Sequence, residues 1–136
     1  MKKTYIFILT HGQWGEALIK STEMIVGTSI SDIKAFSLMP EMPLDDYQSA
    51  IDSTIQALPN HDFIFLVDIL GGTPYQIAAY YTQISNAEAL SGLNMDLLIT
   101  ILNLRNTFAC KDLPTQVLKK YNTSNQYIID LKELLK

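Results

Sequence analysis

Two apolar runs of five residues, each stopping abruptly at a polar group, constrain the fold of this chain more than any other feature. The first is Tyr5-Ile6-Phe7-Ile8-Leu9, followed by Thr10-His11-Gly12, and the second is Phe63-Ile64-Phe65-Leu66-Val67, followed by Asp68. Runs that are apolar at every position are typical of strands buried on both faces, as in a helix-covered parallel sheet. We therefore expect an α/β protein in which His11 and Asp68 each end a strand.

Helical periodicity and turn signals alternate with these strands. Apolar residues recur at three- and four-residue spacing from Trp14 to Ile25, before a stop at Gly27. The other predicted elements are a helix over 44–58, strands over 32–38 and 89–94, and helices over 97–105 and 114–121. Alternating strands and helices predict one domain, residues 1–136, with a doubly wound, mostly parallel sheet and helices on both faces.

Two further segments bear on how the chain is organised. Gly71-Gly72-Thr73-Pro74 signals the start of a helix, with Thr73 predicted as the N-cap and Pro74 as the first helical residue. Tyr127-Ile128-Ile129-Asp130-Leu131 fits either a last strand or the start of a helix that runs to Lys136.

Composition excludes several classes of function. The 136 residues carry a net charge of −4 and a single arginine, Arg105, whereas binding to nucleic acid needs a basic stripe. Cys110 is alone, so paired thiolates cannot hold a metal, and no metal or cofactor is expected. The apolar run after Lys3 ends at Leu9, too short for a signal peptide, and no run is long enough to span a bilayer, which together predict a cytoplasmic protein.

His11 and Asp68 are the candidate catalytic pair. Both follow strands whose carboxyl ends meet at one edge of the predicted sheet, where ligands gather in open α/β folds. If the two strands are neighbours, their ends lie about 4.8 Å apart. A carboxylate at that distance can fix the tautomer of the imidazole and leave its other nitrogen free as a nucleophile or base.

Glycine-rich turns beside this pair are predicted to bind an anion. The backbone amides of Gly12, Gly71, Gly72 and Thr73 lie at the starts of two predicted helices, where amide donors and the helix dipole favour negative charge. An imidazole nucleophile, an orienting carboxylate and an anion cradle together favour phosphoryl transfer through a phosphohistidine. A structural interpretation stays open: a histidine in a turn is often solvated or a cap, and a glycine pair often only a tight turn.

The residues resemble a known family at this point. A strand that ends in Thr-His-Gly, and a Leu-Val-Asp strand followed two residues later by Gly-Gly-Thr-Pro, resemble the IIA component of the mannose-family phosphoenolpyruvate-dependent sugar phosphotransferase system. The resemblance extends over nearly the whole chain and includes the Gly92-Leu93-Asn94 element. Relatives often carry an apolar residue and proline after that element, where this chain has Met95-Asp96.

The resemblance implies a phosphocarrier. His11 would accept a phosphoryl group from the phosphocarrier HPr and pass it to a separate IIB component, with the membrane components IIC and IID involved only indirectly. Asp68 would orient the histidine, the phosphoryl group would sit on the ring nitrogen away from Asp68, and Thr73 stands where serine is common. The implied fold has strand order 2-1-3-4, with an antiparallel strand, here Tyr127 to Leu131, exchanged between the subunits of a homodimer.

Two other functions stay open. A non-enzymatic regulatory or phosphate-sensing module could use the same His11 site, and phosphate that stays on His11 would distinguish it from a carrier. A histidine-dependent phosphatase also becomes phosphorylated on a histidine of its own that follows its first strand. That chemistry normally needs an arginine just before the histidine, where this chain has Thr10.

Overall fold

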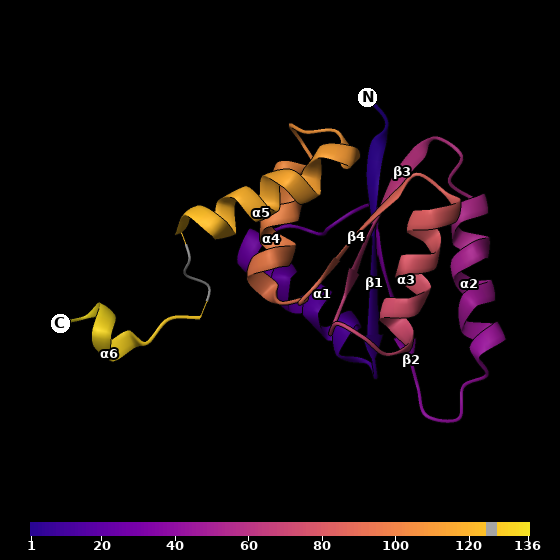
Figure 1. Cartoon of the computed structure of the whole chain (residues 1–136), viewed down its shortest axis with the longest axis horizontal. Coiled ribbons are helices and arrows are strands. Elements are labelled where there is room, and N and C mark those ends of the chain that lie inside the picture. The colour runs from indigo at the N-terminus through magenta and orange to yellow at the C-terminus, as the bar shows by residue number, and fades with distance from the viewer. Residues whose placement is uncertain (125–127) are drawn as a thin grey trace.

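In this computed structural model the chain forms a four-stranded parallel sheet with helices on both faces (Figure 1). The structure describes residues 1–124 and 128–136. The strands are β1 (Lys3–His11), β2 (Ile33–Leu38), β3 (His61–Val67) and β4 (Ala87–Ser91). Their order is β2-β1-β3-β4, and every neighbouring pair is parallel. The fold class and strand order expected from the sequence are thus confirmed.

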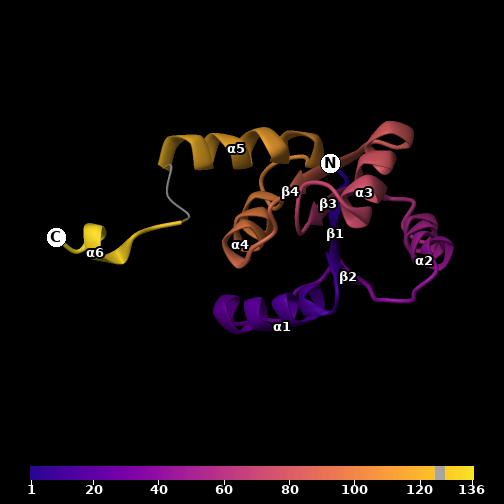
Figure 2. The same ribbon diagram turned by 60° about the horizontal axis from the view of Figure 1, so that its bottom comes forward.

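The helices divide between the two faces of the sheet (Figure 2). They are α1 (Trp14–Val26), α2 (Leu44–Gln56), α3 (Thr73–Ile84), α4 (Met95–Leu104), α5 (Leu113–Ser124) and α6 (Leu131–Leu134), with a 3-10 turn, η1, at Cys110–Asp112. Helices α2 and α3 pack on one face, whereas α1, α4 and α5 pack on the other. Within the described ranges no helix is long and apolar enough to cross a bilayer.

The core explains the two apolar runs. Phe7 and Leu9 of β1 face α2 and α3, while Ile6 and Ile8 face the opposite layer, and all four side chains are fully buried. The ring of Phe7 packs 4.7 Å from that of Phe65, centroid to centroid. Both faces of the central strands are therefore covered, which is why no polar residue interrupts these runs.

Several element boundaries differ from the sequence predictions. Strand β4 starts two residues before the predicted 89–94 and also ends earlier. It ends at Ser91 because the amides of Gly92 and Leu93 both donate to Val67 O and so close the ladder. Thr73 is not an N-cap: it is the first residue of α3, and Gly72 precedes it with φ 84° and ψ 176° and no side-chain cap. Strand β3 begins at His61, two residues before the apolar run that starts at Phe63.

The C-terminal segment ends in a short helix. Tyr127 lies outside the described residues, and residues 128–130 form no strand in the single chain. Helix α6 then begins at Leu131, with the Asp130 side chain accepting from the amides of Lys132 and Glu133. The exchanged antiparallel strand therefore stays a prediction about an assembly of chains.

Candidate functional site

The parallel register brings His11 and Asp68 to the same edge of the sheet. Strands β1 and β3 pair Leu9 with Val67, and the Asp68 amide one residue later still donates to Leu9 O at 3.3 Å. His11 is the last residue of β1, and Asp68 directly follows β3. The side chains meet as predicted, with that of His11 49% exposed and that of Asp68 only 7% exposed.

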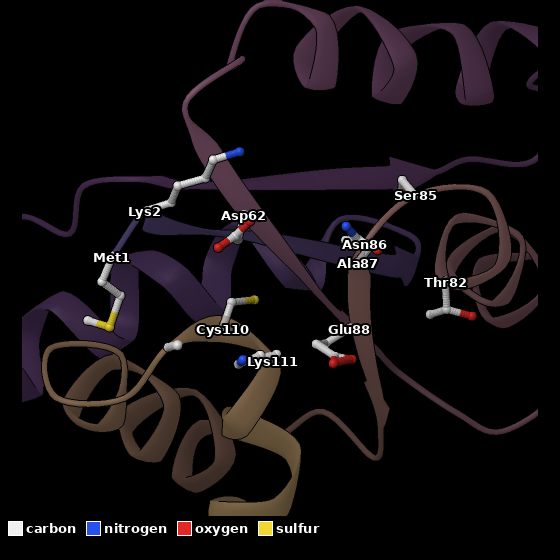
Figure 3. A pocket seen from close by; sticks show the side chains of 11 residues that line it. Met1, Lys2, Asp62, Thr82, Ser85, Asn86, Ala87, Glu88, Cys110 and Lys111 are labelled. Atoms are coloured by element: carbon white, nitrogen blue, oxygen red, sulfur yellow. The ribbon is translucent and has the colours of Figure 1, made fainter.

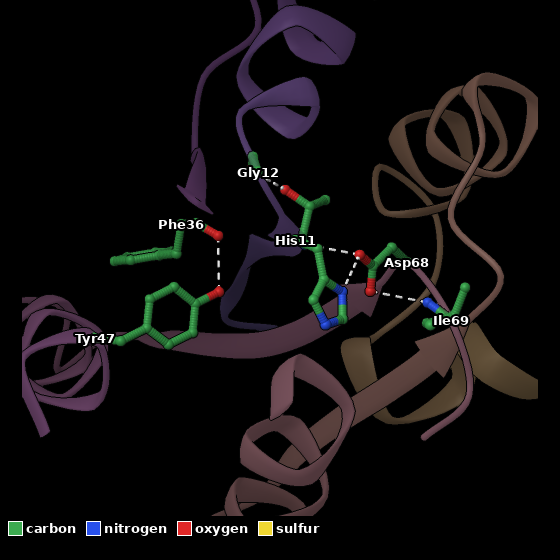
Figure 4. A network of polar contacts seen from close by, with 7 residues as sticks. His11, Gly12, Phe36, Tyr47, Asp68 and Ile69 are labelled. Atoms are coloured by element: carbon green, nitrogen blue, oxygen red, sulfur yellow. Dashed lines mark hydrogen bonds and ion pairs between the residues drawn. The ribbon is translucent and has the colours of Figure 1, made fainter. Parts of the chain in front are cut away.

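Three hydrogen bonds hold the Asp68 carboxylate (Figure 4). Its Oδ2 lies 2.8 Å from His11 Nδ1 and accepts from the backbone amide of His11 at 2.7 Å. Its Oδ1 accepts from the Ile69 amide at 2.9 Å. Both carboxylate oxygens are therefore hydrogen-bonded, and Oδ2 bonds to both the backbone and the ring of His11.

These bonds fix the ionisation of Asp68 and the tautomer of His11. Burial acts to raise the pKa of Asp68, but the bonds from the backbone and ring of His11 and from the Ile69 amide outweigh it, so the pKa lies below its ordinary value. An ionised carboxylate only accepts hydrogen bonds, so the proton between the two groups resides on His11 Nδ1. In the neutral ring Nε2 then carries the free lone pair.

The Nε2 side of the ring lies against the start of α3. A Cβ placed on Gly72 would be 3.3 Å from His11 Cε1 and 3.5 Å from Nε2, so the backbone approaches the ring closely. In the part of the chain that the structure describes, no acceptor bonds the amides of Gly71, Gly72 or Thr73. These donors and the helix dipole are the features of an anion site at a helix N-terminus.

Gly12 contributes differently from the sequence prediction. Its amide donates to Leu38 O at 2.8 Å, so this donor is already occupied and does not face an anion. The carbonyl of Gly12 accepts from the Thr10 hydroxyl at 2.9 Å, and Thr10 is fully buried. Gly12, at φ 70°, therefore shapes and anchors the turn after His11.

Tyr47, within the helix predicted over 44–58, is a further neighbour of the site. Its hydroxyl donates to Phe36 O at 2.7 Å, and the side chain is almost fully buried. Burial, and secondarily the charge of Asp68, raise the pKa of Tyr47 well above its ordinary value. Tyr47 is therefore a neutral donor that ties α2 to β2 beside the His11–Asp68 pair.

The opposite edge of the sheet holds a separate cavity (Figure 3), and Arg105 lies at this edge too. The cavity, about 620 Å³, lies at the amino ends of β3 and β4 among Asp62, Glu88 and Cys110, far from the His11 turn. Arg105 donates from its guanidinium to the carbonyls of Thr4, Ser31 and Asp32 and so joins the end of α4 to β1 and to the turn before β2. Among the described residues, no three His, Cys, Asp or Glu side chains gather as a metal site.

Fold and site together define an open α/β protein with a histidine–carboxylate pair set against free amides at the carboxyl edge of its sheet. Residues 5–118 match the family described as the fructose IIA component of the phosphotransferase system. The chain belongs to this family, the mannose-type IIA components. The family carries a phosphotransfer role in sugar phosphotransferase systems and interaction with HPr and IIB components.

Individual relatives agree with this assignment. The fructose-specific EIIA component of Bacillus subtilis is 32% identical over 110 residues, which cover 79% of this chain and 75% of that protein. The phosphotransferase system component EIIA of Streptococcus agalactiae superposes with a TM-score of 0.82 at 23% identity, covering 96% and 98% of the two chains. The mannose/sorbose-specific IIA subunit of Enterococcus faecalis gives 0.79 at 24% identity, covering 94% and 96%. At these identities the two structures establish the fold.

Proposed function

We propose that His11 is the phosphorylated residue of this carrier, accepting a phosphoryl group on Nε2 from phospho-HPr and passing it to a IIB component. The bond between His11 Nδ1 and Asp68 Oδ2 at 2.8 Å is the observation that carries the proposal. It commits one ring nitrogen to the carboxylate and leaves the other as a nucleophile. That nucleophile lies against Gly72, at the start of a helix whose amides suit an anion.

The transfer needs no further reactant. The Nε2 lone pair attacks phosphorus, a new N–P bond forms, and the N–P bond of the donor histidine breaks with its electron pair returning to the donor imidazole. The Nδ1 proton stays between His11 and Asp68, so the positive charge that develops on the ring is stabilised by the carboxylate. The amides of Gly72 and Thr73 would stabilise the phosphoryl oxygens. In the reverse step, a nucleophile of IIB attacks phosphorus, and the N–P bond to His11 breaks with its electron pair returning to Nε2.

The test is phosphoenolpyruvate-dependent phosphorylation with purified enzyme I and HPr, followed by intact mass. Wild type should gain one acid-labile phosphate that drains onto an added IIB protein. His11→Ala should gain none and keep the circular dichroism spectrum of the folded chain. An undiminished phosphate signal in His11→Ala would refute the assignment.

The two alternatives make different predictions. A regulatory module would acquire phosphate on His11 and never release it to IIB, so the second half of the same experiment separates it from a carrier. A histidine-dependent phosphatase would need cationic clamps on the phosphate. Arg105, the sole arginine of the sequence, is instead bound to backbone carbonyls at the opposite edge of the sheet. This placement favours the carrier over the phosphatase.

We also propose that the carrier works as a homodimer in which the C-terminal segment pairs with β4 of the other chain. Strand β4 is at the edge of the sheet, and a groove flanks it on each face, about 150 Å³ beside α5 and about 270 Å³ beside α3. Ile128 and Leu131 are 85% and 65% exposed in the single chain. An unpaired edge with apolar flanks is a template for strand addition.

Truncation tests this assembly. Removing residues 128–136 should give a monomer by light scattering, whereas removing only residues 132–136 should leave the dimer intact. A dimer that survives the longer truncation would show that this segment is not the exchanged strand.

A further inference from the structure

A groove of about 430 Å³ opens along the free edge of β2, next to the His11 turn. Its apolar lining comes from β2, the loop after it and the first turns of α2, and its charged lining from α1, β2 and α2. The apolar side chains include Phe36, Met39, Met42 and Tyr47, and the charged ones are Glu16, Lys34 and Asp46.

The groove is continuous with the site. Leu38 pairs with His11 in the register of β1 and β2, and its carbonyl anchors the Gly12 amide. Phe36, two residues earlier on the same strand, lines the groove and accepts the hydroxyl bond from Tyr47 (Figure 4). The groove therefore starts about one strand spacing, roughly 4.8 Å, from the strand that ends in the histidine.

Any protein that exchanges a phosphoryl group with His11 must lie over this part of the edge. Transfer requires the two histidines to be within bonding distance, whereas a standard protein interface buries about 800 Å² on each partner. A patch of that size centred on His11 extends well beyond one strand spacing and so reaches the β2 groove.

The charges of the groove indicate which side chains it can receive. Glu16 and Asp46 are exposed, and within the described residues neither forms an ion pair. The Lys34 ammonium lies 5.2 Å from the centroid of the Phe36 ring, over its face. Asp45, next to Asp46, is exposed as well, so the rim is acidic around an apolar floor.

We propose that this groove is the docking site for the phosphohistidine-bearing donor protein, which inserts an apolar side chain between Met42 and Phe36 and faces Glu16 and Asp46 with Lys or Arg. The proposal rests on the phosphocarrier function proposed above. Rim charges of this kind act mainly on encounter and register. Thioether side chains adapt to differently shaped partners, which suits a surface that must release one protein and bind another.

The test compares two groove variants with a matched control. Asp46→Lys reverses a rim charge, and Met42→Gln makes the floor polar at similar length. Asp112→Lys makes the same change of net charge on η1, which lies near the amino edge of the sheet. Each variant is assayed with phospho-HPr and also with phosphoramidate, a small phosphoryl donor that needs no protein docking.

With phospho-HPr, Asp46→Lys and Met42→Gln should each raise KM about three- to tenfold at low salt and leave kcat within about a factor of two. The effect of Asp46→Lys should fade near 0.5 M salt, where the Debye length falls to about 4 Å. Phosphoramidate should label both variants at the wild-type rate, and Asp112→Lys should behave as wild type with either donor.

The outcomes distinguish failure of the proposed docking site from failure of the proposed phosphocarrier function. If neither donor labels wild-type His11, the phosphocarrier function itself fails. If wild type is labelled but both groove variants keep the wild-type KM for phospho-HPr, the docking site is overturned and the function stands. An equal rise in KM for Asp46→Lys and Asp112→Lys would show a net-charge effect and would also overturn the docking site.

Discussion

Replacing Gly72 with alanine tests whether the close approach of α3 to the histidine matters for transfer. Gly72 has φ 84° and ψ 176°, a combination that is essentially restricted to glycine and costs other residues about 1–3 kcal/mol. With an unfolding entropy of about 2.1 cal/mol/K per residue, a 136-residue chain loses about 3–10 °C in Tm for that cost.

Transfer should suffer for a second reason. The new methyl group would lie 3.3 Å from His11 Cε1 and 3.5 Å from Nε2, so the ring must move by a few tenths of an ångström. A misplacement of about 1 Å can cost about a hundredfold in rate, and this smaller shift should lower kcat about tenfold. The methyl group would also stand beside Nε2, the nitrogen proposed to carry the phosphoryl group.

Gly27→Ala is the matched control. Gly27 ends α1 at φ 80°, and a Cβ there would meet nothing within 4 Å. It should therefore lose stability, about 1 kcal/mol, without any loss of transfer. Thermal unfolding and rapid-quench transfer from phospho-HPr, run on both variants, separate the two effects. A Gly72→Ala protein that transfers at the wild-type rate would refute the claim that this contact positions His11.

Three further outcomes follow from the same geometry. Asp68→Ala should slow transfer to His11 about 10- to 100-fold, because a charge-assisted hydrogen bond is worth about 1.5–3 kcal/mol. Light scattering should still detect a dimer of this variant, and an unchanged transfer rate would remove Asp68 from the mechanism. Because the folded pKa of Asp68 lies below its ordinary 3.8, its stabilising effect is complete at neutral pH and is lost as the pH falls below that value. The difference in urea unfolding free energy between wild type and Asp68→Asn should accordingly shrink below about pH 4, and a constant difference would contradict this linkage. Arg105→Lys should lower the unfolding free energy by about 1–3 kcal/mol without changing transfer, since lysine cannot span the three carbonyls that the guanidinium bonds.

The position of the His11–Asp68 pair followed from the sequence because it depends on backbone topology alone. Two strands buried on both faces must lie at the centre of a covered sheet, and parallel strands present their carboxyl ends at one edge. His11 and Asp68, the polar residues that follow these runs, therefore lie at that edge regardless of the conformation of the loops. The pairing of Leu9 with Val67 is the register that this argument requires.

The details that failed depend on where individual hydrogen bonds go. Gly12 and Gly72 both precede helices, but the register of β2 supplies Leu38 O to the Gly12 amide, whereas no described acceptor reaches Gly72. Nothing local in the sequence distinguishes the two glycines. The internal role of Arg105 is equally non-local, because its acceptors Thr4 and Asp32 lie 101 and 73 residues away in sequence.

The hydrogen-bond donors at the site, neutral or charged, affect how readily His11 would release a phosphoryl group. The segments that join the strands to the following helices at this edge, residues 12–13, 39–43, 68–72 and 92–94, contain no lysine or arginine. A phosphoryl group, at about −1.5 to −2 charge, would meet neutral amides and a helix terminus of about half a charge. Each bond to a fixed cation would add about 1.5–3 kcal/mol, or about 10- to 100-fold, to the retention of the group. A carrier that passes a phosphoryl group between two histidines of similar chemistry must instead retain that group weakly. Neutral amide donors beside an oriented imidazole allow such weak retention.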